Sequence, residues 1–113
     1  MAKDPHLRPA RGEIWLVSLD PTVGSEIQKT RPCVVISPPE INDHLHVVLV
    51  APLTSGSRPA PFRVSTVVDS QPGLMLLEQI RAVDTNRMIK RRGQLDKRTL
   101  SAALAVLRAL FAE

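Results

Sequence analysis

The sequence is poor in the residues that several kinds of functional site require. Its 113 residues include one cysteine, one tryptophan, two phenylalanines and no tyrosine. A single cysteine, Cys33, cannot form a disulfide within one chain, and its place in an apolar run indicates a packing role. Modules that read RNA bases on aromatic platforms need several exposed rings. Any contact with nucleic acid would therefore depend on arginine, lysine and backbone groups.

Long apolar runs and common catalytic motifs are also missing. No stretch approaches the roughly 18 apolar residues of a membrane span, and the first six residues contain no apolar signal core. These absences predict a cytoplasmic protein without a membrane partner. The chain has no P-loop, GxGxxG, GxSxG or HExxH motif. His44 and His46 could share one face of a strand but have no third ligand, so we expect neither a metal site nor a cofactor.

The length and net charge of the chain indicate its domain organisation and the kind of partner it suits. The chain suits a single domain, and its hydrophobic content of 43% is that of an ordinary globular protein. Residues 1–10 are polar and contain prolines, which predicts a flexible N-terminal tail followed by one domain over residues 11–113. The formal net charge of +4 favours a polyanionic partner or an acidic protein segment.

Short apolar runs between turn signals predict a mainly β fold with a C-terminal α-helix. We expect strands at residues 13–19, 33–36, 46–50, 62–68 and 74–83, with Pro52 ending the third and a turn over residues 69–73. Residues 40–44 are predicted as a turn-rich connection, and no strand is predicted across the basic run 90–92. An apolar stripe predicts a helix from about Lys97 to Ala112 that Asp96 caps; its members are Leu100, Ala103, Leu104, Leu107, Leu110 and Phe111.

The segment over residues 20–37 organises the chain. A polar loop ending in Arg31 and Pro32 runs straight into the apolar residues 33–36. A residue before proline favours extended backbone, so the Arg31 guanidinium should project in a fixed direction. A planar, permanently charged group held in this way suits a phosphate, although the position also suits an ordinary surface arginine. Two further polar segments, 54–58 and 78–84, follow or end predicted strands.

Seven short motifs occur in a fixed order along the chain. They are RGEIW (11–15), DPTVGSE (20–26), RPCVVIS (31–37), PLTS (52–55), PF (61–62), EQIR (78–81) and RM (87–88). Each motif is weak alone, but their order and spacing resemble the MazF/PemK toxins of bacterial toxin–antitoxin pairs, from Arg11 to about Ala112. The resemblance implies a small SH3-like β-barrel with a terminal helix, assembled as a homodimer.

The resemblance also implies an activity. Members of this family arrest growth as metal-independent endoribonucleases that cut single-stranded RNA at short sequences and leave a 2′,3′-cyclic phosphate and a 5′-hydroxyl. An antitoxin blocks the RNA groove with its extended C-terminal segment. By position, Arg31 and Thr54 match the catalytic pair. The predicted residues of the RNA groove are Ser25, Glu26, Lys29, Ser55, Gln79 and Arg81.

The sequence does not identify the general base, and it is also compatible with two other functions. A guanidinium with a pKa above ~12 is poorly suited to accept a proton at neutral pH. Glu26 and Asp84 are the available carboxylates, and Asp84 also suits the cap of a helical turn through Arg87 and Met88. The same barrel occurs in toxins that inhibit DNA gyrase by protein contact alone. An inactive module that binds RNA or an antitoxin would share the same sequence features.

Overall fold

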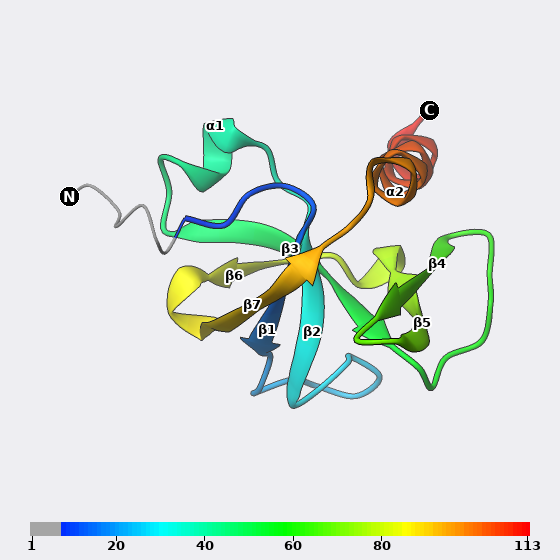
Figure 1. The fold of residues 1–113 in the computed structure, drawn as a ribbon, viewed down its shortest axis with the longest axis horizontal. Coiled ribbons are helices and arrows are strands. Elements are labelled where there is room, and N and C mark those ends of the chain that lie inside the picture. The colour runs from blue at the N-terminus through cyan, green and yellow to red at the C-terminus, as the bar shows by residue number, and fades with distance from the viewer. Residues whose placement is uncertain (1–7) are drawn as a thin grey trace.

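The computed structural model describes residues 8–113, so residues 1–7 of the predicted tail lie outside the described residues. Within this range, seven antiparallel strands form one curled sheet (Figure 1). They are β1 (Glu13–Ser18), β2 (Thr30–Val35), β3 (Val47–Thr54), β4 (Arg63–Val68), β5 (Gln71–Leu76), β6 (Arg81–Asp84) and β7 (Met88–Gln94). The strand order is β4-β5-β3-β2-β1-β7, and β6 pairs with the first half of β3. The predicted mainly β class is confirmed.

Helical elements are short except for the last. They are α1 (Pro39–Asn42), the 3₁₀ turns η2 (Leu77–Gln79) and η3 (Thr85–Arg87), and α2 (Lys97–Phe111). The predicted C-terminal helix and its cap are confirmed, because the Asp96 carboxylate accepts a 2.9 Å hydrogen bond from the Thr99 N–H. Figure 1 shows α2 on the side of the β4–β5 hairpin. Among the described helices, none is long and apolar enough to cross a membrane.

Apolar side chains lie on both faces of the sheet because neighbouring residues of a strand point in opposite directions. One buried cluster joins the sheet to α2; it contains Ile14, Val34, Ile36, Ala51, Leu53, Met75, Leu77, Leu95, Ala103 and Leu107. The other lies on the opposite face and contains Trp15, Val17, Leu19, Cys33, Val35, Val48, Val50 and Val83. Adjacent residues Ile14 and Trp15 thus belong to different clusters, so both faces of β1 are covered.

The prediction that Pro52 ends the third strand was wrong. Pro52 is buried inside β3 and lies opposite Cys33 of β2. On the other side of β3, the partner changes from β6 up to Val50 to β5 from Leu53 onward. Proline lacks a backbone N–H and is best tolerated where a ladder is interrupted. The change of partner lets the strand continue to Thr54, so Thr54 is held by a sheet rather than by a loop.

Three other boundaries also differ from the prediction. The expected strand over residues 74–83 is two strands separated by η2, and the turn after β4 is confined to Asp69 and Ser70, whose φ angles are +51° and +65°. β7 covers the basic run 90–92, where no strand was expected. Within residues 8–113 only β1 pairs with β7, and charged side chains are common on edge strands. The run therefore lacks the apolar alternation that reveals an interior strand.

The N-terminal boundary also lies earlier than Arg11. Pro9 is fully buried, and the Ala10 N–H donates a 2.7 Å hydrogen bond to Glu13 Oε1. The connection after β2 contains a helical turn, α1, whose Asn42 is buried and donates to the Ser37 carbonyl at 2.7 Å. These residues therefore belong to the packed domain.

Candidate functional site

Antiparallel pairing of β2 and β3 brings Arg31 and Thr54 together. Cys33 lies opposite Pro52, and continuing this register by two residues places Arg31 opposite Thr54. Both residues line one pocket of about 240 Å³, together with Ser55. Each is at the end of its strand, so a rigid sheet holds the two side chains beside open space. The proline after Arg31 contributes to this position because it keeps the start of β2 extended.

The polar atoms of this pair are only partly used within the protein. Arg31 Nε donates to the Gln28 carbonyl at 3.2 Å, whereas its two terminal nitrogens have no hydrogen-bond partner among the described residues. Thr54 Oγ1 accepts the Gly56 N–H at 3.2 Å, which leaves the hydroxyl hydrogen available. A fixed guanidinium and a free hydroxyl donor are suited to bind phosphate oxygens.

A second pocket, of about 410 Å³, is lined by the residue of β3 that precedes those of the first pocket. Pro52 lines this second pocket, and the next two residues of β3, Leu53 and Thr54, line the first. Four of the six predicted groove residues line the second pocket; they are Ser25, Glu26, Gln79 and Arg81. Ser55 lines the first pocket and Lys29 lines neither. Seven of the predicted residues, from four separate segments of the chain, thus surround two neighbouring pockets.

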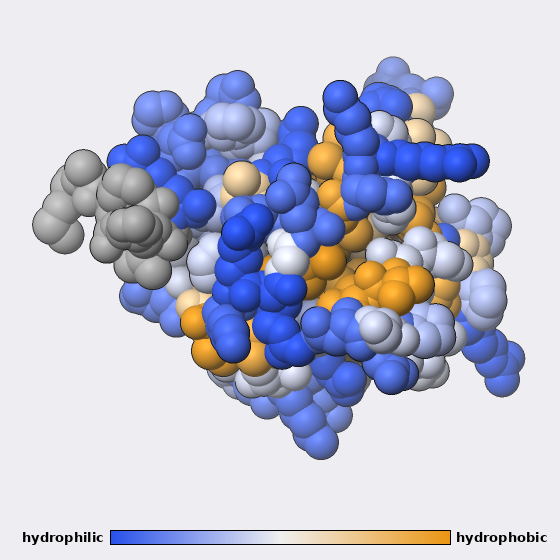
Figure 2. Space-filling view, in the orientation of Figure 1, coloured by the Kyte–Doolittle hydropathy of each residue, from blue (hydrophilic) through white to orange (hydrophobic). Residues whose placement is uncertain are grey.

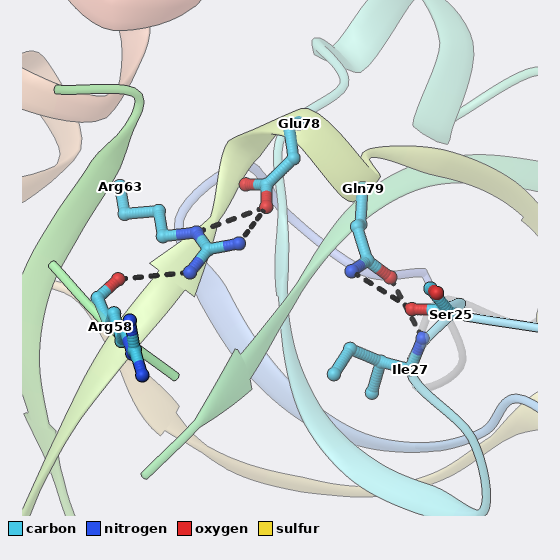
Figure 3. Close-up of polar contacts among 6 residues, drawn as sticks. All are labelled: Ser25, Ile27, Arg58, Arg63, Glu78 and Gln79. Carbon is cyan, nitrogen blue, oxygen red and sulfur yellow. Dashed lines mark hydrogen bonds and ion pairs between the residues drawn. The ribbon is translucent and has the colours of Figure 1, made fainter. Parts of the chain in front are cut away.

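Side-chain hydrogen bonds hold the loop between β1 and β2, residues 19–29, which lines the second pocket. Figure 3 shows the bonds that Gln79 makes to this loop. Gln79 Oε1 accepts the Ile27 N–H at 2.8 Å, and Gln79 Nε2 donates to the Ser25 carbonyl at 3.5 Å. The Glu26 carboxylate accepts the Val23 N–H at 2.5 Å. Arg81 donates to the Leu19 carbonyl at 3.1 Å. The free loop therefore has a defined conformation.

Lys29 closes the base of this loop. Its φ of +70° is unusual for a residue with a side chain, and its N–H donates to Asp20 Oδ1 at 2.9 Å. The Lys29 carbonyl accepts the Leu19 N–H at 3.0 Å. Lys29 thus fixes the point at which the loop enters β2 and directs Arg31.

Asp84 lies apart from the other candidates. It pairs with Val47 at the far end of β3, seven residues before Thr54, which corresponds to roughly 23 Å along a strand. Its carboxylate accepts the Asn86 N–H at 2.8 Å and caps η3, as the sequence predicted for the helical turn. Of the two carboxylates named as bases, the structure brings only Glu26 to the pockets.

Sequence reasoning missed Asp69 as a residue of the site. Asp69 lines the Arg31 pocket and forms an ion pair with Arg92 of β7. The sequence identified Asp69 only as the start of a turn, because a turn signal describes local backbone and not the surface against which the turn packs. Among the residues that line this pocket, Asp69 is the only carboxylate. Its negative charge is balanced by the ion pair with Arg92.

Cys33 lies two residues after Arg31 but has no nucleophilic character. Burial raises the pKa of its thiol to about 12, and the Coulombic effect of Arg81 offsets only part of that increase. Within residues 8–113, no group of three or more histidine, cysteine, aspartate or glutamate side chains is arranged to hold a metal ion. The polar side chains that line the pockets are arginines, hydroxyls, amides and carboxylates.

Comparison with known proteins gives consistent results for family and fold. A family model described as the PemK-like, MazF-like toxin of type II toxin–antitoxin systems matches residues 10–111. The endoribonuclease PemK of Escherichia coli is 44% identical over 79 residues, which cover 66% of this chain and 59% of that protein. The crystal structure of MazF from Deinococcus radiodurans superposes with a TM-score of 0.82 at 23% identity and covers 93% of this chain and 97% of that one.

An endoribonuclease from mycobacterial species, solved in complex with its cognate antitoxin, has the same fold. Its TM-score is 0.75 at 20% identity, with 89% of this chain and 92% of that chain covered. These likenesses extend the shared fold over nearly the whole of the described residues.

Proposed function

Because the chain belongs to the PemK-like, MazF-like toxin family of type II toxin–antitoxin systems, we propose that it is a sequence-specific endoribonuclease that cuts single-stranded RNA without a metal ion. The observation that carries this proposal is the juxtaposition of Arg31 and Thr54 at the ends of two paired strands, above a pocket that a phosphate can enter. Relatives named as endoribonucleases support the same reaction class.

The proposed reaction is attack by a ribose 2′-hydroxyl on the adjacent phosphorus. The 2′-oxygen forms a bond to phosphorus as its proton leaves, and the bond to the 5′-oxygen breaks as that oxygen gains a proton. The products are a 2′,3′-cyclic phosphate and a 5′-hydroxyl. Arg31 stabilises the negative charge on the pentacoordinate phosphorane through charge-assisted hydrogen bonds, and Thr54 donates to a phosphate oxygen.

The second pocket supplies groups that suit neighbouring nucleotides. The Gln79 amide bonds to the β1–β2 loop and retains one N–H and one carbonyl lone pair for a base edge, and Arg81 suits a phosphate. Ser25, Ser55 and Lys29 provide further donors near the loops. Of the two carboxylates predicted as the base, only Glu26 lines a pocket, and its contact with the Val23 N–H holds it in the loop. The base itself is left unassigned.

We further propose that the toxin acts in the cytoplasm as a homodimer and that a cognate antitoxin neutralises it by occupying the two pockets. Growth arrest follows from cleavage of cellular RNA. The antitoxin complex of the mycobacterial endoribonuclease with the same fold supports the choice of partner. An acidic or carboxylate-bearing segment would complement the arginines at the pockets and the net charge of +4.

Incubation of the purified protein with a long single-stranded RNA in the presence of EDTA tests the nuclease proposal. We expect cuts at a restricted sequence with 2′,3′-cyclic phosphate ends. Arg31→Ala should reduce the rate by roughly 10²-fold or more, because charge stabilisation at the phosphorane is lost. Arg98→Ala, which removes an exposed arginine of α2 outside both pockets, serves as the matched control and should cut normally.

Three outcomes contradict the proposal. Cleavage that persists in Arg31→Ala removes this residue from the mechanism, and cleavage that EDTA abolishes shows a metal requirement. Intact RNA across several substrates, with circular dichroism showing folded protein, directs attention to DNA gyrase inhibition or to an inactive binding module.

A further inference from the structure

The two pockets are bordered by two loops that are distant in sequence. The β1–β2 loop, residues 19–29, leads directly into Arg31. The β3–β4 loop, residues 55–62, directly follows Thr54. The 3₁₀ turn η2 lies between β5 and β6 and forms a wall of the second pocket through Glu78 and Gln79. It bonds directly to the β1–β2 loop and is linked to the β3–β4 loop through Arg63 of β4. One short element therefore lies between the two loops.

Arg63, the first residue of β4, ties η2 to the β3–β4 loop (Figure 3). Its Nε and one terminal nitrogen donate to Glu78 Oε2 at 3.0 and 2.5 Å, and the other terminal nitrogen donates to the Arg58 carbonyl at 2.9 Å. The side chains of Arg63 and Glu78 are only 20% and 29% exposed, so water screens this pair less than a fully exposed one. The forked guanidinium alone can make both connections at once, since a lysine ammonium is a single point charge.

Gln79, the next residue of η2, ties the same element to the other loop. Its amide bonds to Ile27 and Ser25 fix the β1–β2 loop, and the Gln28 carbonyl of that loop accepts from Arg31 Nε. A chain of hydrogen bonds and short backbone segments thus begins at Arg58 in the β3–β4 loop and passes through Arg63 to η2. From η2 it continues through the β1–β2 loop to Arg31.

We propose that Arg63, Glu78 and Gln79 form a bracket that sets the spacing of the two loops and thereby selects the RNA sequence that fits between them. The proposal rests on the nuclease function above and extends it. Arg63 and Glu78 are positioning residues, because they act on Arg31 and Thr54 only through the loops. Selection among nucleobases depends on how firmly the shape of a pocket is held. Loosening the bracket should therefore change which sequences are cut more than it changes the chemistry.

Hydrogen exchange tests the bracket without reference to activity. In Arg63→Ala the Ile27 amide should exchange about fivefold faster, as expected when one supporting hydrogen-bonded contact is lost, although Arg63 does not touch it. Arg63→Lys, which retains the charge but not the fork, should show the same direction of change. Arg91→Lys is the matched control, because it alters a different arginine–glutamate pair, with Glu13. The bracket is overturned if the Ile27 amide exchanges at the same rate in both Arg63 variants as in the control.

The distribution of cut sites in a randomised RNA pool provides the second readout. The wild-type protein should cut one sequence class. Arg63→Lys and Glu78→Gln should also cut other sequences, and the frequency of these cuts, relative to cuts at the preferred site, should rise several-fold. A purely structural loss would reduce cutting at all sequences in proportion, and that result overturns the proposal. The exchanged pair, Arg63→Glu with Glu78→Arg, should partly restore the wild-type profile. If the wild-type protein cuts no RNA, the nuclease function is refuted. The hydrogen-exchange experiment on the Ile27 amide still decides whether the bracket couples the loops.

Discussion

At the scale of single residues, Cys33 shows how position controls chemistry. The side chain is fully buried between strands β1 and β3, and its thiol donates weakly to the Arg31 carbonyl at 3.6 Å. A thiolate in this environment would lose its hydration, which is why the pKa rises to about 12. Cys33, two residues after Arg31, is therefore a packing residue, as the sequence predicted.

This raised pKa predicts a loss of stability at alkaline pH. The folded-state pKa exceeds the ordinary value of 9.0, so the contribution to stability is complete below pH 9 and decreases as the pH approaches 12. At about 1.4 kcal/mol per unit, the decrease between pH 9 and pH 11 is on the order of 3 kcal/mol. Urea unfolding of the wild type and of Cys33→Ala at several pH values between 8 and 11 measures it. The variant should lose less stability over that range, and parallel curves for the two proteins would contradict the prediction.

At the scale of elements, helix α2 is held by one face. Ala103 and Leu107 are buried in the cluster that also contains Met75 and Leu77, whereas Leu110 and Phe111 are 44% and 77% exposed. The sequence predicted one continuous apolar stripe that includes all four helix residues. The sheet covers only the first part of that stripe, because α2 extends beyond the strands against which it packs.

Leucines in the buried and exposed parts of the stripe should therefore contribute differently to the free energy of unfolding. Leu107→Ala should reduce the free energy of unfolding by about 2–4 kcal/mol, because it leaves a cavity between α2 and the sheet. Leu110→Ala, a change of the same size at an exposed position, should change it by less than about 0.5 kcal/mol. Denaturant unfolding of both variants provides the comparison. Equal losses would mean that the exposed end of α2 is covered in solution.

At the scale of the whole molecule, an apolar surface remains open beside the Arg31 pocket. Figure 2 shows it between α2 and the β4–β5 hairpin. A groove there is lined by Val67, Leu74 and Leu95 together with hydroxyl side chains, and Asp96 is its only charged member. The groove shares Ser55 with the Arg31 pocket. Depletion of charge is typical of the centre of a protein interface.

We expect a second copy of the chain to cover this groove. Sedimentation equilibrium should give a mass of twice 12.4 kDa. Val67→Lys should shift the protein to monomer, because Val67 is 64% exposed and the new charge would be buried in the interface. Val23→Lys, at a position 80% exposed on the β1–β2 loop, is the control and should remain a dimer. A dimer that tolerates Val67→Lys would place the interface elsewhere.

The sequence by itself determined the class of fold, the helix with its cap, and the identity of most candidate site residues. Helical spacing of leucines, β-branched runs and the order of short motifs are local properties, so they can be read from one sequence. The register of β2 with β3, which places Arg31 opposite Thr54, is consistent with those assignments. The strand at the basic run 90–92 escaped prediction because it lies at a sheet edge and carries no buried alternation.

Tertiary structure alone decided which of the polar residues meet. Asp69 lines the Arg31 pocket and Asp84 lies far from it, although Asp69 follows β4, Asp84 ends β6, and the sequence predicted a turn or cap role for both. The path of β3 through Pro52 and the bracket at Arg63 depend on partners many residues away. Pairings of this kind arise from the packing of the whole sheet, and no local pattern encodes which strands will be neighbours.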